Sequence, residues 1–179
     1  CWSEMTNLIM PELKYFPYKD GFLAYREEGV GPVLFFLHGM NGNSRSWASS
    51  FLSLRNNFRI IAWDAPSFGS SGSFGDSIEV YQSAAKALIS GLGVEDVILV
   101  GHSMGGLVAT KLASDTGMSI AGLVLSSSHL GFGQPKGEPL MFRYSNRIEA
   151  LNKNSTNAEY TMERAKRSTP EGTHEDIIK

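Results

Sequence analysis

A serine between glycines, in residues 101–106, has the spacing of a nucleophilic turn. The segment reads Gly-His-Ser-Met-Gly-Gly and lies between an apolar run and a stretch whose composition favours a helix. Gly-x-Ser-x-Gly between a strand and a helix is a nucleophile elbow, a turn so tight that the serine Oγ stands clear of the backbone. Gly101 and Gly105 fit this turn because a Cβ at either position would collide with the neighbouring strand or helix. Ser103 is therefore the candidate nucleophile, and an acyl-serine intermediate is the chemistry that it would support.

Acyl transfer at Ser103 also requires hydrogen-bond donors for the oxyanion that develops on the substrate. The backbone N–H of Met104, directly after the nucleophile, is one expected donor. The other is expected from the loop His38-Gly39-Met40, which follows a second apolar run. Gly39 would let this loop come close to the serine. Each donor contributes on the order of 3 kcal/mol to transition-state stabilisation.

The serine further needs a general base within hydrogen-bond distance and a carboxylate that orients the base. His102 is adjacent to Ser103 and cannot easily turn its ring toward the neighbouring Oγ, so we expect a structural role for it. His129 follows Ser128 with no acid beside it and is a candidate for lining the substrate pocket. His174 follows polar, helix-like sequence and no strand, which makes it a poor candidate for the base. The sequence therefore shows no convincing partner for the nucleophile.

Strands and helices in alternation must position these residues. Four apolar runs predict strands, and the segments between them carry apolar residues at helical spacing. We expect strands at 33–37, 58–63, 97–100 and 121–125, helices at 46–54, 77–90 and 107–116, and a β-hairpin within 13–26. Continuously apolar runs, the last one included, indicate strands that are buried on both faces. This alternation implies right-handed βαβ units and a mostly parallel, doubly wound sheet of class α/β.

The character of the chain changes after Ser128. Residues 129–179 contain no valine and no buried-strand run. They begin with a segment rich in Gly and Pro and continue with polar, helix-like stretches at 140–151 and 157–167. We therefore expect an α/β core at 1–128, and at 129–179 the beginning of a helical cap or lid over the sheet.

Three blocks in this order resemble the α/β-hydrolase superfamily, in its branch of soluble serine hydrolases that carry a helical cap. The blocks are His38-Gly39-Met40, the loop 64–71 and the elbow 101–106. The middle block resembles the family's D-x-P-G-x-G-x-S run but has Ser67 where a glycine is common. We expect a less unusual backbone angle at this serine than a glycine would allow.

The resemblance assigns roles to several residues. It implies that the second oxyanion donor is the N–H of Met40, and that His38 supports the oxyanion loop without taking a proton from the serine. His38 and Gly39 are then expected to lie at the substrate site. Asp64 ends a predicted strand and is expected to fix the following turn through its carboxylate.

The resemblance also implies that the last strands of the sheet are missing. In the family, the catalytic acid follows a sixth or seventh strand and the histidine follows the eighth. We therefore expect a fragment of a protein about 80–100 residues longer. The catalytic acid and histidine would then lie beyond Lys179, and the fragment alone would be inactive.

The expected function is cleavage of a carboxylic ester or lactone by Ser103, as in carboxylesterases, enol-lactonases and carbon–carbon bond hydrolases, which the chain resembles. A serine at the elbow argues against the haloalkane dehalogenase and epoxide hydrolase branches, whose nucleophile is a carboxylate. Two alternatives stay open. One is a cofactor-free perhydrolase or acyltransferase that uses the same serine. The other is a non-catalytic binding protein with the hydrolase fold.

Composition narrows the choice of partner and compartment. Hydrophobic residues make up 42% and charged residues 19%, as in an ordinary globular protein. A formal net charge of −2 gives no electrostatic footprint for nucleic acid or an anionic membrane, and the apolar runs are too short to span a bilayer.

The single cysteine, Cys1, rules out an intrachain disulfide and favours the cytoplasm. We also expect the chain to begin inside a longer reading frame. The sequence has no cluster at metal-ligand spacing and no nucleotide fingerprint, so we expect no metal and no cofactor. The expected partner is a small-molecule ester or lactone. The sequence leaves the oligomeric state open.

Overall fold

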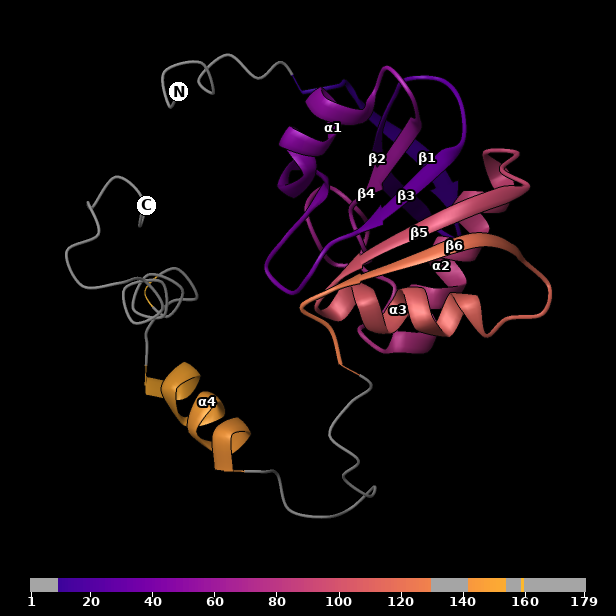
Figure 1. Ribbon diagram of the computed structural model, residues 1–179. Coiled ribbons are helices and arrows are strands. Elements are labelled where there is room, and N and C mark those ends of the chain that lie inside the picture. Colours follow the sequence, from indigo (N-terminus) through magenta and orange to yellow (C-terminus); the bar gives the residue numbers. More distant parts are fainter. Residues whose placement is uncertain (1–9, 130–141, 154–158, 160–179) are drawn as a thin grey trace, which may run out of the picture. The chain divides into compact units, whose positions relative to one another are not determined.

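The computed structural model describes residues 10–129, 142–153 and 159 (Figure 1). The chain divides into two compact units, Cys1–Phe132 and Gly133–Lys179. In the second unit, the described residues form helix α4 (Phe142–Lys153), on which Glu149 and Lys153 form an ion pair one turn apart. The predicted helix at 157–167 lies outside the described residues except for residue 159, and the assignment of 129–179 to a cap stays a prediction.

The first unit contains one six-stranded sheet with the order β1-β2-β4-β3-β5-β6. β1 and β2 form the predicted antiparallel hairpin, and β2 also pairs antiparallel with β4. β4, β3, β5 and β6 are parallel to one another. The mostly parallel α/β sheet expected from the sequence is therefore confirmed. The strands are β1 (Leu13–Tyr18), β2 (Gly21–Glu28), β3 (Val33–Leu37), β4 (Arg59–Trp63), β5 (Asp96–His102) and β6 (Ser119–Ser126).

Helices pack on both faces of the sheet, as a doubly wound fold requires. Helices α2 (Ile78–Gly91) and α3 (Met104–Ala113) share one apolar core with the side chains of Phe35 and Leu99, and Figure 1 shows these helices together on one side of the strands. The 3-10 helix η2 (Ser44–Trp47) and helix α1 (Ala48–Leu54) cover the other face, where Phe51 packs with Leu34 and Phe36. Among the helices that the structure describes, none is long and apolar enough to cross a bilayer.

Strand β6 differs from its prediction as a buried strand. Leu123, Val124 and Leu125 are 40%, 49% and 47% exposed. The reason is the place of β6 at the end of the strand order: among the described residues it pairs only with β5. A continuous apolar run therefore identified the strand correctly but not its burial.

Helix α3 lies three residues earlier than predicted, beginning at Met104 instead of residue 107 and ending at Ala113 instead of residue 116. Ser114 caps its end: its N–H donates to the Thr110 carbonyl, and its Oγ donates to the Lys111 carbonyl at 2.8 Å. The next N–H, that of Asp115, donates to the Leu112 carbonyl, so the chain has already left the α-helical pattern. Serine and aspartate often end helices in this way because they bond to nearby backbone groups.

Candidate active site

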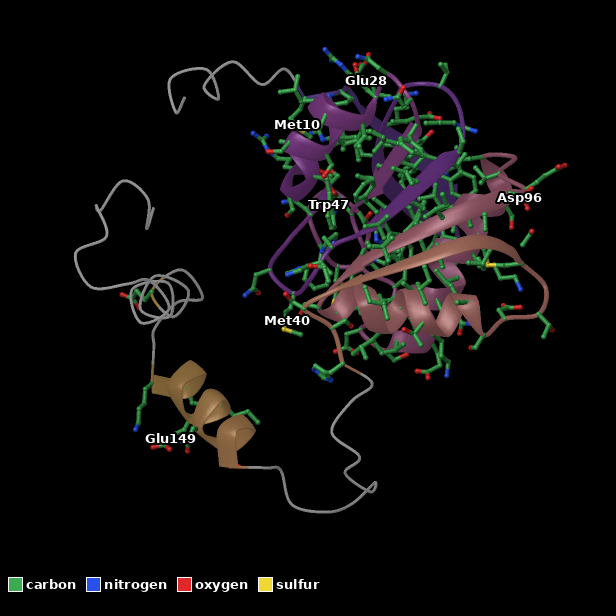
Figure 2. The ribbon with its side chains drawn as sticks, viewed as in Figure 1. Met10, Glu28, Met40, Trp47, Asp96 and Glu149 are labelled. Atoms are coloured by element: carbon green, nitrogen blue, oxygen red, sulfur yellow. The ribbon has the colours of Figure 1, made fainter. Side chains whose placement is uncertain are left out.

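The carboxyl ends of β3, β5 and β6 bring the predicted functional residues to one edge of the sheet. Leu37 is in register with Gly101, and His102 with Ser126. The loops that follow these parallel strands therefore begin side by side, which is where open α/β sheets bind ligands. Figure 2 shows Met40 at this end of the sheet.

Ser103 has the backbone conformation of a strained turn. It occupies the N-cap of α3 with φ 51° and ψ −115°, in a region that residues with a side chain rarely adopt. Its N–H donates to the Ser126 carbonyl at 2.9 Å, and its carbonyl accepts the Gly106 N–H at 3.0 Å. A strained residue kept in place by its neighbours is typical of a functional position, so this geometry agrees with the proposed nucleophile.

The glycines around Ser103 are required by close backbone contacts. A Cβ on Gly105 would lie 2.0 Å from the Leu37 carbonyl oxygen, and one on Gly101 would lie 2.6 Å from the Gly105 carbonyl oxygen. The sequence argument for these two glycines is thus confirmed. Gly39 is close to Ser103 as well, because a Cβ there would be 3.2 Å from the Cβ of Ser103.

The loop after β3 is fixed by the side chain of His38, which is only 2% exposed. Its Nε2 accepts the Ala65 N–H at 3.0 Å, so the proton of the neutral ring lies on Nδ1, which donates to the Gly39 carbonyl at 2.8 Å. The Gly42 N–H donates to the same carbonyl at 3.0 Å. These contacts hold the loop after β3 in place, and both nitrogens of the ring are engaged in them; the role of this loop as an oxyanion donor stays a prediction.

Burial lowers the pKa of His38 below its usual value, because the low-dielectric interior disfavours the charged ring. The hydrogen bond to Gly39 and the negative charge of Asp64 act in the opposite direction but do not outweigh burial. The ring is therefore neutral near pH 7, as the hydrogen bond from Ala65 to Nε2 requires.

Asp64 connects the loop after β4 with the loop after β3. Its side chain is buried, and its carboxylate accepts the Ser70 N–H at 2.8 Å, as expected for a residue that fixes the following turn. The other carboxylate oxygen accepts the Ser44 N–H at 2.7 Å, a contact that the sequence did not indicate. Ser67 departs from prediction: its φ is 68°, the left-handed conformation that a glycine would adopt at less cost. Its N–H donates to the Gly72 carbonyl at 2.9 Å, which shows that the closed loop imposes this angle.

A cavity of about 360 Å³ opens beside the elbow. It reaches Gly39 and His102, the neighbours of Ser103, although Ser103 itself does not line it. Asn41 and Ser46 also contribute, and no sequence signal marked them, because their place depends on how η2 folds back over β3. The lining consists of His38, Gly39, Met40, Asn41, Gly42, Ser46, Trp47, His102 and Ser126.

Among the residues that the structure describes, no histidine is placed as a general base for Ser103. Within residues 10–129, 142–153 and 159, no hydrogen bond joins a histidine ring to its hydroxyl; the ring of His102 lies against Gly39, where an added Cβ would be 2.8 Å from Nδ1. His129 is exposed and does not line the cavity, and His174 lies outside the described residues. The described part of the chain also contains no cluster of His, Cys, Asp or Glu that could bind a metal ion.

The amino-acid sequence is similar to those of known proteins. The profile of the family described as "Alpha/beta hydrolase family" matches residues 34–176. An uncharacterized protein of Mycobacterium tuberculosis is 33% identical over 122 residues, which is 67% of this chain and 35% of that protein. A non-heme haloperoxidase of Rhodococcus erythropolis is 36% identical over 87 residues, 47% of this chain and 32% of the relative. The chain thus spans about a third of the length of these curated relatives.

Solved structures with different activities share the fold. A thermophilic esterase from Thermogutta terrifontis matches 93% of this chain and 64% of its own, with a TM-score of 0.74 and 23% identity. An epoxide hydrolase from Vigna radiata matches 81% of this chain and 47% of its own, with a TM-score of 0.67 and 27% identity. Because one fold carries both activities, the reaction must be argued from the residues of the site.

Proposed function

The chain belongs to the alpha/beta hydrolase family, and we propose that it acts there as a serine hydrolase that cleaves a neutral carboxylic ester or lactone. The observation that carries the proposal is the conformation of Ser103, a non-glycine residue at φ 51° between a parallel strand and a helix. Such strain persists only where the surrounding structure imposes it, and here it occurs at the edge of the sheet where open α/β folds bind ligands.

The reaction would proceed in two steps at Ser103. The hydroxyl oxygen attacks the substrate carbonyl carbon and passes its proton to a general base. The carbonyl oxygen becomes an oxyanion that accepts the N–H groups of Met104 and Met40. The alcohol leaves with the proton from the base, and water then hydrolyses the acyl-serine by the same route. This mechanism needs a histidine and a carboxylate from outside the described residues.

The charge of the cavity favours a neutral substrate. None of the nine described residues that line it is Asp, Glu, Lys or Arg, and burial keeps His38 neutral by lowering its pKa. A charged acyl or alcohol group would lose its hydration there without gaining an ion pair. A volume of about 360 Å³ lies at the lower end of the range for ligand pockets, which favours a small group.

A second candidate reaction keeps the same serine. The relatives named non-heme haloperoxidase favour transfer of the acyl group from Ser103 to hydrogen peroxide instead of water. The products would be a peracid and the free serine. Measuring the partition of one acyl donor among water, peroxide and alcohols distinguishes the two reactions, since a hydrolase gives mainly the carboxylic acid.

A fluorophosphonate probe tests the proposal in the full-length protein, because only an activated serine reacts quickly with it. We expect rapid labelling that Ser103→Ala abolishes and that Ser53→Ala, a change at an exposed serine of α1, leaves intact. Labelling that survives Ser103→Ala would mean that another residue is the nucleophile. A wild-type protein that folds but does not react would favour the binding protein of the same fold.

A further inference from the structure

The two N–H groups assigned to the oxyanion belong to peptide units whose carbonyl oxygens accept hydrogen bonds from elsewhere. In a trans peptide the C=O and the following N–H are coplanar and point in opposite directions, so fixing the oxygen also fixes the N–H. The Met40 N–H shares a peptide with the Gly39 carbonyl, which accepts from His38 and from Gly42. The Met104 N–H shares a peptide with the carbonyl of Ser103.

The Ser103 carbonyl, at the N-cap of α3, accepts bonds from the first turn of the helix and one from outside it. Within the first turn, the Gly106 N–H donates to it at 3.0 Å. From outside the helix, the donor is the hydroxyl of Ser128, at 3.0 Å, which comes from the segment after β6. Ser103 also donates its N–H to the Ser126 carbonyl, so the end of β6 and the segment directly after it contact the backbone of Ser103 on both sides.

The position of Ser128 leaves its hydroxyl little freedom. Its side chain packs so closely on α3 that a Cβ on Gly106 would lie 2.1 Å from the Ser128 Oγ and 2.5 Å from its Cβ. Ser128 is also partly buried, so water competes less for its hydrogen bond than at an exposed site. Because Gly106 has no side chain, there is room beside α3 for the Ser128 hydroxyl. This hydroxyl bonds to the Ser103 carbonyl, which belongs to the same peptide unit as the Met104 N–H.

We propose that Ser128 is a positioning residue: through the Ser103 carbonyl it fixes the direction of the Met104 N–H, the oxyanion donor next to the nucleophile. This inference rests on the proposed serine-hydrolase function. A donor that is already oriented needs no reorganisation when the oxyanion forms, which is how fixed dipoles lower a barrier. Without the hydroxyl, the Ser103–Met104 peptide is held only by bonds from within the first turn of α3 and can tilt with that turn.

The experiment compares Ser128→Ala with Ser114→Ala in the full-length protein. Ser114 is a matched control because its hydroxyl also donates to a backbone carbonyl, that of Lys111 at 2.8 Å, but at the other end of α3. We expect Ser128→Ala to lower kcat about three- to tenfold, as for loss of one neutral hydrogen bond, with KM unchanged. The rate of fluorophosphonate labelling should fall by a similar factor. Ser114→Ala should match the wild type in both, and Ser128→Thr, which keeps the hydroxyl, should recover at least part of the loss.

A measurement without catalysis separates this inference from the proposed function. In the ¹H–¹⁵N spectrum of the ligand-free protein, the amide resonance of Met104 should move in Ser128→Ala and stay in place in Ser114→Ala. If the wild type neither turns over ester nor reacts with the probe, the proposed function fails, and the resonance alone decides whether Ser128 orients the amide. An unmoved Met104 resonance, or wild-type kcat and labelling in Ser128→Ala, would overturn the inference. So would a rise in KM with unchanged kcat.

Discussion

At the scale of single residues, His38 shows how a titratable side chain can be used as a fixed support. Both of its ring nitrogens are hydrogen-bonded to backbone groups, the Ala65 N–H and the Gly39 carbonyl. Only the neutral tautomer with its proton on Nδ1 satisfies both contacts. If Nε2 were protonated, its N–H would face the Ala65 N–H, and two donors without an acceptor would repel each other. The loop after β3, the proposed oxyanion loop, therefore depends on a ring that stays uncharged.

Replacing His38 by alanine should destabilise the protein in a pH-dependent way. Near pH 7.5 we expect a loss of about 2–4 kcal/mol in the free energy of unfolding, from a cavity and an unpaired Ala65 N–H. The lowered pKa of His38 in the folded state means that, below about pH 6.5, the unfolded wild-type chain binds a proton that the folded chain does not. Wild-type stability therefore falls as pH decreases through this window, while His38→Ala lacks this component.

Urea unfolding of both proteins near pH 7.5 and about pH 5.5 checks the sign. The difference between wild type and His38→Ala should shrink at the lower pH. A difference that stays constant or grows would contradict a buried neutral ring. The comparison of two proteins removes the contribution of the other histidines, which both contain.

At the scale of elements, the turn between β5 and α3 depends on how closely the helix approaches β3. Gly105 lies where a Cβ would be 2.0 Å from the Leu37 carbonyl oxygen and 2.7 Å from that of His38. These are backbone atoms, which cannot move aside as a flexible side chain can. The contact sets the helix against the strand that carries the oxyanion loop, and so joins the two halves of the proposed site.

Replacing Gly105 by alanine should therefore damage stability and reactivity together. We expect a loss of about 3 kcal/mol, the upper end of the usual cost of overpacking, and a large fall in probe labelling at Ser103. Gly122→Ala in β6 is the matched control, because a Cβ there meets only Ile98 at 3.5 Å, an ordinary contact. It should change stability by no more than about 0.5 kcal/mol. Urea midpoints of the two variants check the difference, and equal midpoints would mean that the close approach is absent in solution.

The sequence predicted these elements well wherever local chemistry determines them. The strand at 33–37 was located to the residue. Predictions failed where a distant contact decides: the Ser67 angle follows from closure of its loop onto Gly72, and the exposure of β6 from its place in the strand order. The contact between Ser128 and Ser103 spans 25 residues and has no local signal. Residue types and spacing thus located the strained turn at Ser103 but not the hydrogen bonds around it.

At the scale of the whole molecule, the sheet is unevenly protected. β3 lies between β4 and β5, and four of its five residues are buried. β6 lies at the end of the strand order with Leu123, Val124 and Leu125 largely exposed. The elbow is beside this less protected side, because Ser103 follows β5 and its backbone bonds to residues at the end of β6. The stability of the β6 region therefore bears directly on the backbone geometry of Ser103, the proposed nucleophile.

This exposure predicts self-association of the 179-residue chain studied by itself. An exposed edge strand with apolar side chains offers unpaired backbone groups and an apolar patch to another copy. Val124→Lys should suppress the association, because a lysine on the edge strand opposes pairing with a second copy.

Val30→Lys is the control: Val30 is 77% exposed but lies outside the strands, in the connection between β2 and β3. Light scattering over a concentration series should show the wild type and Val30→Lys growing in mass while Val124→Lys stays monomeric. A wild type that is monomeric at every concentration, or two lysine variants that behave alike, would show that the exposed face of β6 does not drive association.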